Sequence, residues 1–192
     1  MSRLQYNSPV ILTYALISLA AVCICSWTGL GYALFSVYKT SLLDPLFYLR
    51  LFTHVLGHQD FSHYFSNFLV ILLIGPMLEE KYGSKRLLLL MVITALITGI
   101  IFVTVSPSGH ALLGASGILF MLMLLCSFAN FKKGRIPVTL ILILVLYIGR
   151  EIVQGVTTSD NVSNMTHIAG GLLGAALGFI FNNEGMKSIG DN

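Results

Sequence analysis

The sequence predicts an all-α, polytopic membrane protein, and its composition, apolar segments and charge distribution all indicate this fold class. Of the 192 residues, 56% are hydrophobic and only 10% are charged, whereas an ordinary soluble domain carries roughly 25% charged residues. Lipid is therefore the expected solvent for most of the surface. Because no internal repeat or low-complexity tract interrupts the chain, we expect a single domain over residues 1–192.

Six apolar segments are the expected membrane helices, at about residues 10–30, 62–82, 86–105, 115–131, 136–152 and 167–182. The first is longer than a typical signal-peptide core and no small-residue cleavage site follows it closely, so we interpret it as a helix. The connection 31–61 is rich in aromatic residues, which settle at membrane interfaces. We expect it to be a loop sunk partly into the outer leaflet.

The positive residues orient these helices. Eight Lys and Arg residues fall on the side of the N-terminus and three on the opposite side. Because cytoplasmic loops carry the excess of positive charge, we expect an integral protein of the cell membrane with both termini in the cytoplasm. Helices two, four and six then begin at the outer face.

Several classes of ligand find no support in the sequence. The net charge of +3 is dispersed, so no basic surface for nucleic acid is expected. The three cysteines have no CxxC or Cys/His spacing, and no cofactor motif is present. His54 and His58 could bind a metal at i and i+4, but without an H-E-x-x-H pattern we favour structural hydrogen bonds for both and expect no metal.

Polar residues stand at the start of each even-numbered helix: His63 and Asn67 in helix two, Ser116 in helix four and His167 in helix six. Such residues are costly in a membrane and therefore indicate function. The shared topology places them on one side, and helix four, at about 17 residues or roughly 25 Å, is shorter than the hydrocarbon core. We expect Ser116 and His167 to meet at a similar depth below the outer interface.

This combination fits nucleophilic catalysis. A serine hydroxyl is a poor nucleophile until a base takes its proton, and histidine is the usual base. Ser116 lies at a helix N-terminus, where free backbone N–H groups favour a developing oxyanion. Gly170 and Gly174 form a small-residue stripe that lets helix six approach helix four at Gly117.

Each feature alone has a simpler interpretation. Ser116 could cap a helix, His63 and Asn67 could bond between helices, and the glycine stripe could only pack. The soluble hydrolase elbow G-x-S-x-G is not matched, because Ile118 replaces its last glycine and no strand is expected at residues 112–113. A small transporter or channel would need polar residues at several depths, whereas here they gather near one face.

The chain resembles the rhomboid family of intramembrane serine proteases from about residue 50 to residue 181. Residues 114–117, GASG, resemble the family's GxSG motif; His167 with Gly170 and Gly174 resembles HxxGxxxG; and His63 with Asn67 resembles HxxxN. Glu79 resembles a structural glutamate of the family, and residues 49–54 resemble the loop that leads into helix two. Leu49 replaces a common tryptophan, and Phe120 replaces a common tyrosine on the catalytic histidine.

The resemblance implies a six-helix rhomboid-like bundle with a water-filled cavity opening to the outer face. It implies Ser116 as nucleophile and His167 as general base. It also implies oxyanion donors in His63, Asn67 and the Ser116 N–H. Supporting residues would be Gly114, Gly117, Phe120, Asn164, Gly170 and Gly174.

The expected activity is intramembrane serine endopeptidase, acting in the lipid bilayer on transmembrane protein substrates, with helix five as a mobile gate. The alternative is a catalytically inactive rhomboid-like protein that binds membrane clients. The oligomeric state stays open.

Overall fold

In the computed structural model, the described residues are 6–28, 31–128, 138, 141–143, 145–146, 167–176 and 180. Three helices within them are long and apolar enough to cross a membrane: α1 (Pro9–Thr28), α4 (Phe61–Tyr82) and α5 (Ser84–Val105). Two shorter apolar helices follow, α6 (Ser116–Phe128) and the helix His167–Ala176. The expected all-α membrane class is confirmed, while six helices stay a prediction because most of segment 136–152 lies outside the described residues.

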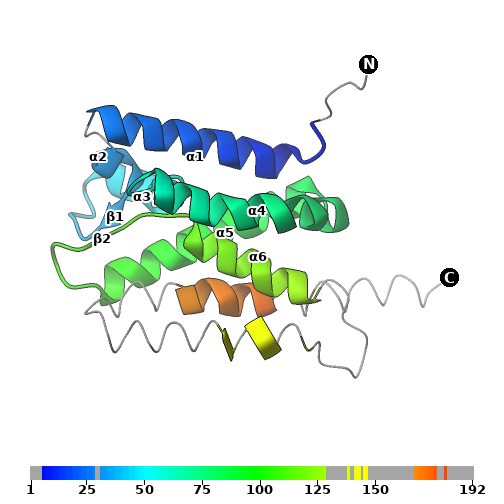
Figure 1. Cartoon of the computed structure of the whole chain (residues 1–192). Coiled ribbons are helices and arrows are strands. Elements are labelled where there is room, and N and C mark those ends of the chain that lie inside the picture. Colours follow the sequence, from blue (N-terminus) through cyan, green and yellow to red (C-terminus); the bar gives the residue numbers. More distant parts are fainter. Residues whose placement is uncertain are drawn as a thin grey trace, which may run out of the picture.

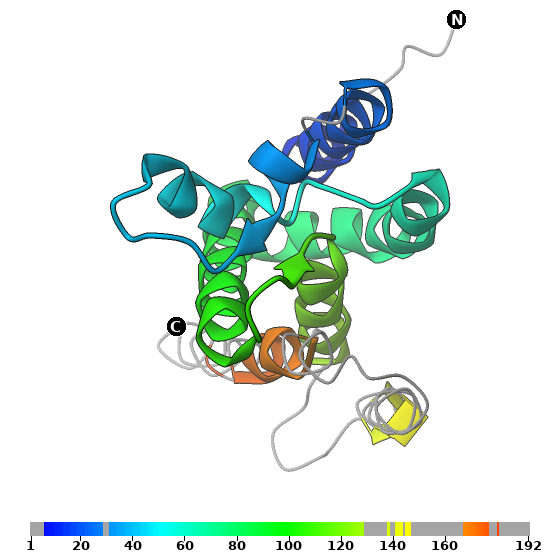
Figure 2. The same ribbon diagram turned by 90° about the vertical axis from the view of Figure 1, so that its left-hand side faces the viewer.

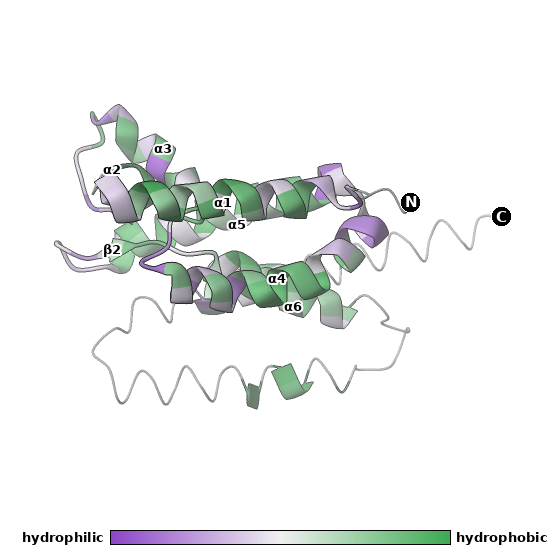
Figure 3. Ribbon diagram, turned by 45° about the horizontal axis from the view of Figure 1, so that its top comes forward, coloured by the Kyte–Doolittle hydropathy of each residue, from purple (hydrophilic) through white to green (hydrophobic). Residues whose placement is uncertain are grey.

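The long helices run side by side (Figure 1). Helix α1 packs on α4, α4 packs on α6, and α5 packs on α6. Viewed from the end, the helix His167–Ala176 lies next to α5 and α6 (Figure 2). Hydrophobic residues cover most of the length of these helices, and hydrophilic ones gather towards their ends (Figure 3), as lipid burial requires.

A buried carboxylate joins the start of α1 to the end of α4. The two oxygens of Glu79 accept hydrogen bonds from the backbone N–H groups of Val10 and Ile11, both at 3.0 Å. The first N–H groups of a helix have no partner within the helix, so Glu79 caps α1 from outside. Close packing continues one turn away, where an added Cβ on Gly75 would lie 2.7 Å from Ile11.

The segment 31–61 is more ordered than the expected loop. It contains α2 (Gly31–Phe35), β1 (Val37–Tyr38) and α3 (Pro45–Thr53). The buried Arg50 side chain ties them together, since it donates to the carbonyl of Ala33 at 2.7 Å, pairs with Asp44 at 3.0 Å and lies over the Tyr38 ring. The connection 31–61 therefore contains short regular elements, and its seat in the outer leaflet stays a prediction.

A short strand precedes α6, contrary to the expectation of none. Strand β2 (Ala111–Leu112) pairs antiparallel with β1, with Val37 opposite Leu112 and Tyr38 opposite Ala111. Irregular backbone at membrane depth needs internal hydrogen-bond partners, and this pairing supplies them. It also fastens segment 31–61 to the turn that leads into Ser116.

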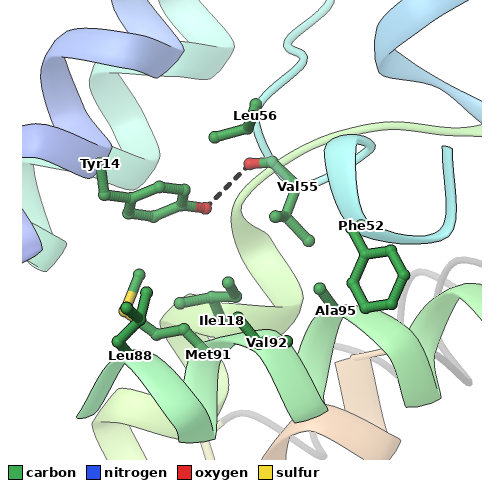
Figure 4. A pocket seen from close by; sticks show the side chains of 9 residues that line it. All are labelled: Tyr14, Phe52, Val55, Leu56, Leu88, Met91, Val92, Ala95 and Ile118. Atoms are coloured by element: carbon green, nitrogen blue, oxygen red, sulfur yellow. Dashed lines mark hydrogen bonds between the residues drawn. The ribbon is translucent and has the colours of Figure 1, made fainter. Parts of the chain in front are cut away.

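An apolar cavity of about 150 Å³ lies between α1, α5 and the chain after α3 (Figure 4). Its polar feature is the Tyr14 hydroxyl, which already donates to the carbonyl of Val55 at 2.8 Å. With that hydroxyl occupied and the rest of the lining apolar, this cavity has no group suited to acid–base chemistry. The polar chemistry gathers instead at the start of α6.

Candidate active site

Ser116 is the first residue of α6 and follows a tightly held turn. Gly114 has a φ of +134°, a conformation that favours glycine. Its N–H donates to the carbonyl of His54 at 2.9 Å, and the N–H of Ala115 donates to Nε2 of His58 at 3.2 Å. Two hydrogen bonds to acceptors in segment 54–58 thus position the backbone immediately before the serine.

The structure brings Ser116 and His167 together. Nε2 of His167 lies 2.7 Å from Oγ of Ser116, within the distance that a general base needs. The Phe120 ring lies 5.2 Å from the imidazole, centroid to centroid, in a tilted arrangement. Phe120 is itself buried in α6, so it limits the positions that the imidazole can take.

Glycines make the approach of the two helices possible. A Cβ on Gly170 would collide with the backbone of Gly117, and one on Gly174 would collide with the backbone of Met121. Gly117 is also close-packed on its other side, because an added Cβ there would lie 3.3 Å from Thr98. The helix His167–Ala176 and α6 therefore touch backbone to backbone, in the manner of small-residue stripes in membranes.

His63 stands beside the turn before Ser116, and the Asn67 amide bonds to the backbone of His63. A Cβ added to Gly114 would lie 2.9 Å from Cε1 of His63 and 3.9 Å from Oγ of Ser116, so the imidazole and the hydroxyl flank this glycine. The buried Asn67 amide donates to the carbonyl of His63 at 3.0 Å. The HxxxN residues therefore share one helical face, as their spacing predicted.

A polar cavity of about 440 Å³ opens next to His63. Gln59 and Tyr32 line it together with residues 109–113. The sequence analysis did not select Gln59, Tyr32 or His110 as site residues, because they come from distant parts of two connections that only the folded chain brings together. The cavity is large enough for several peptide atoms and for water.

His54 and His58 are both buried and hydrogen-bonded, the arrangement favoured over a metal site. Nδ1 of His54 lies 3.1 Å from the carbonyl of Arg50, and Nε2 lies 3.4 Å from the Thr98 hydroxyl. Burial lowers the pKa of each imidazole to about 4, and for His58 repulsion from His63 adds to this. Both rings are therefore neutral at pH 7.

Metal-ligand clusters of three or more His, Cys, Asp or Glu are absent from the described ranges. Asn164, expected to help orient His167, falls outside those ranges.

The contact between His58 and the backbone of Ala115 was missed by the sequence analysis. The i, i+4 pair His54 and His58 was the available signal, but it did not show which backbone group the second ring would meet.

Comparison with known proteins identifies the family. The Rhomboid domain model matches residues 46–184, more than half of the chain. The chain belongs to the rhomboid family. Proteins called rhomboid protease GlpG from Salmonella newport, Salmonella typhi and Salmonella typhimurium are each 30% identical to it over 136 residues. The match covers 68% of this chain and 48% of each relative, so the chain spans about half the length of the curated relatives it matches.

Membership of the rhomboid family agrees with the three membrane-crossing helices, and the chain is an integral membrane protein. The matched range contains α4, α5, α6 and the helix His167–Ala176. The Ser116–His167 contact thus lies within the rhomboid domain, as does the lining of the polar cavity beside His63 apart from Tyr32.

Proposed function

We propose that this rhomboid-family chain is an intramembrane serine endopeptidase that cleaves transmembrane proteins in or near their membrane segments. The observation that carries the proposal is the 2.7 Å contact between Nε2 of His167 and Oγ of Ser116 at the start of an apolar helix. A serine hydroxyl within hydrogen-bond reach of an imidazole that can take its proton is an activated nucleophile. A protein that only binds membrane clients has no need for this contact.

The proposed reaction begins when Ser116 Oγ attacks a peptide carbonyl while Nε2 of His167 takes the hydroxyl proton. The tetrahedral intermediate then collapses, the C–N bond breaks and His167 returns the proton to the leaving amine. Water attacks the resulting acyl-enzyme, with His167 again as base, and releases the new carboxylate. Every proton passes through one imidazole, so the chemistry needs no cofactor.

Stabilisation of the oxyanion falls to a small set of donors. The N–H groups of Gly114 and Ala115 are already bonded to His54 and His58, so the N–H of Ser116, the next along the chain, is the backbone donor that we assign. Its position at the N-terminus of α6 adds the favourable end of the helix dipole. The His63 ring flanks the same turn, and we assign it as a second donor, with Asn67 as a third after rotation towards the site.

Substrate and water are proposed to reach the dyad from the outer face, through the polar cavity beside His63. This agrees with both termini lying in the cytoplasm, because α4 and α6 then begin at the outer side with their polar ends. Water in such a cavity also allows hydrolysis within the membrane. The cell membrane as location and helix five as gate stay part of this proposal.

Cleavage of a single-span reporter protein in proteoliposomes tests the activity. Wild-type protein is expected to release a product that Ser116→Ala and His167→Ala do not release. Ser127→Ala is the matched control, because Ser127 lies on the same helix and donates to the carbonyl of Met123. Reporter that is bound but left intact by the wild type, in lipid and at neutral pH, would replace this proposal with the client-binding alternative.

A further inference from the structure

The side chain of His58 touches two parts of the proposed oxyanion site, although it does not reach Ser116 itself. It is 1% exposed and lies in the short connection between α3 and α4. Its Nε2 accepts the N–H of Ala115 at 3.2 Å, and its Nδ1 lies 3.3 Å from the carbonyl of Leu56. Both ring nitrogens are therefore engaged with backbone, one on each side of the imidazole.

These two contacts select a single tautomer. A backbone N–H can only donate, so Nε2 must be the unprotonated nitrogen. A carbonyl can only accept, so the ring proton must sit on Nδ1 and point at Leu56. The imidazole is thus a fixed link between segment 54–58 and the turn before Ser116, and it performs this task only in the neutral form.

Aromatic neighbours hold the ring of His58 in place. The His63 ring meets it edge to face at 5.0 Å, Tyr64 does so at 5.6 Å, and Phe68 packs at 5.7 Å. His63 is also the ring that flanks Gly114. Its imidazole is therefore held between the glycine turn and His58, with little freedom to swing away from the serine.

We infer that His58 is a positioning residue that aligns both proposed oxyanion donors, the Ser116 N–H through its bond to Ala115 and the His63 ring through direct packing. This inference rests on the proposed function and adds a residue to it. A donor contributes to catalysis only when it is aimed at the position of the oxyanion before the reaction starts. Small displacements of such groups lower the turnover rate strongly.

Two substitutions separate the hydrogen bond from the packing. His58→Phe keeps an aromatic ring between His63, Tyr64 and Phe68 but offers no acceptor to Ala115. We expect its kcat on a reporter substrate to fall about 10- to 100-fold, less than the loss of an oxyanion donor itself, with KM changed less than about twofold because ground-state binding is untouched. His58→Gln places an amide oxygen near the position of Nε2. It should recover at least half of the loss in log kcat caused by His58→Phe.

A core variant controls for a general loss of stability. Leu78 is fully buried on α4, eleven residues beyond Asn67, and Leu78→Ala should lower the thermal midpoint without lowering kcat at temperatures below it. If His58→Phe keeps a wild-type kcat while folded, or if Gln is no better than Phe, the inference is wrong. If wild-type protein shows no Ser116-dependent cleavage at all, the proposed function fails instead.

The tautomer can be read in the wild-type protein, with His58→Gln used only to assign the signal, which covers the case in which His58→Phe does not fold. In wild-type protein carrying ¹⁵N-labelled histidine, His58 should show a protonated Nδ1 and an unprotonated Nε2 at pH 7, and His54, whose Nδ1 also faces a carbonyl, should give a second signal of this kind. The assignment to His58 follows from the signal that is lost in His58→Gln. A protonated Nε2 on this residue would overturn the inference, because that nitrogen could not accept the N–H of Ala115.

Discussion

Replacing Glu79 by alanine removes the acceptor that holds the start of α1 against the end of α4. The carboxylate accepts from Val10 and Ile11 at 3.0 Å and from the Ser84 hydroxyl at 2.7 Å. Hydrogen bonds to a charged group contribute about 1.5–3 kcal/mol each, and a buried donor left alone costs about 1–3 kcal/mol. Because the three bonds share one carboxylate and are not additive, we expect a loss of about 3–5 kcal/mol in the free energy of unfolding.

Thermal unfolding in a mild detergent measures this loss. A loss of that size should lower the melting temperature on the order of 10 °C for a chain of this length. Glu79→Gln keeps one acceptor oxygen and should recover about half of the loss. The control is Glu80→Ala, since Glu80 is the neighbouring acid on α4 but is exposed. The reasoning is refuted if Glu79→Ala melts within about 2 °C of wild type, or no lower than Glu80→Ala.

Two further predictions concern the helix contact and the buried histidines. Gly170→Ala should abolish cleavage by pushing His167 away from Ser116. Gly171→Ala is the control and should stay active, because its Cβ would meet only a Leu124 side-chain atom at 3.2 Å. Equal activities of the two variants in the reporter assay would contradict this prediction. Acidification should destabilise the fold between pH 6.5 and about 4. In this range His54 and His58 bind protons in the unfolded chain but not in the folded protein, where burial lowers the pKa of each to about 4. The slope is roughly 1.4 kcal/mol per pH unit for each histidine. The melting temperature should fall less steeply with decreasing pH in His58→Gln than in the wild type. A wild-type melting temperature that does not change across this range would argue against buried neutral rings.

The positions of the long apolar helices were readable from the sequence because lipid requires such helices. An apolar run near 20 residues has few alternatives to a membrane helix, and α1, α4 and α5 overlap with the first three expected spans. The meeting of Ser116 with His167 was predicted because both residues were expected to begin even-numbered helices on one side of the membrane. A glycine at every fourth position then indicated which helix would come closest.

The structure of segment 31–61 was harder to predict, for two different reasons. Helix α3 had a local signal, because Asp44 caps it with Pro45 at its first position, and the analysis gave more weight to the aromatic residues around it. Helix α2 and the β1–β2 pairing had none. A five-residue helix is unstable alone, and pairing Val37 with Leu112 depends on contacts made only after the bundle has formed.

The contacts of the polar side chains were likewise only partly predictable from the sequence. The spacing of His63 and Asn67 showed that they share a helical face, but it could not show that the Asn67 amide would bond to the carbonyl of His63. His58 was expected to make structural hydrogen bonds, and its partner proved to be the residue before the serine. Such details depend on the register between separate helices, which one sequence does not reveal.

Labelling of the detergent-solubilised protein with a fluorophosphonate probe tests the central claim most directly, because the probe reacts covalently with an activated serine and needs no knowledge of the substrate. Wild-type protein is predicted to be labelled, whereas Ser116→Ala and His167→Ala are not, and Ser127→Ala is labelled like the wild type. Labelling that persists in Ser116→Ala, or a folded wild type that neither reacts with the probe nor cleaves a reporter in lipid, would contradict the account.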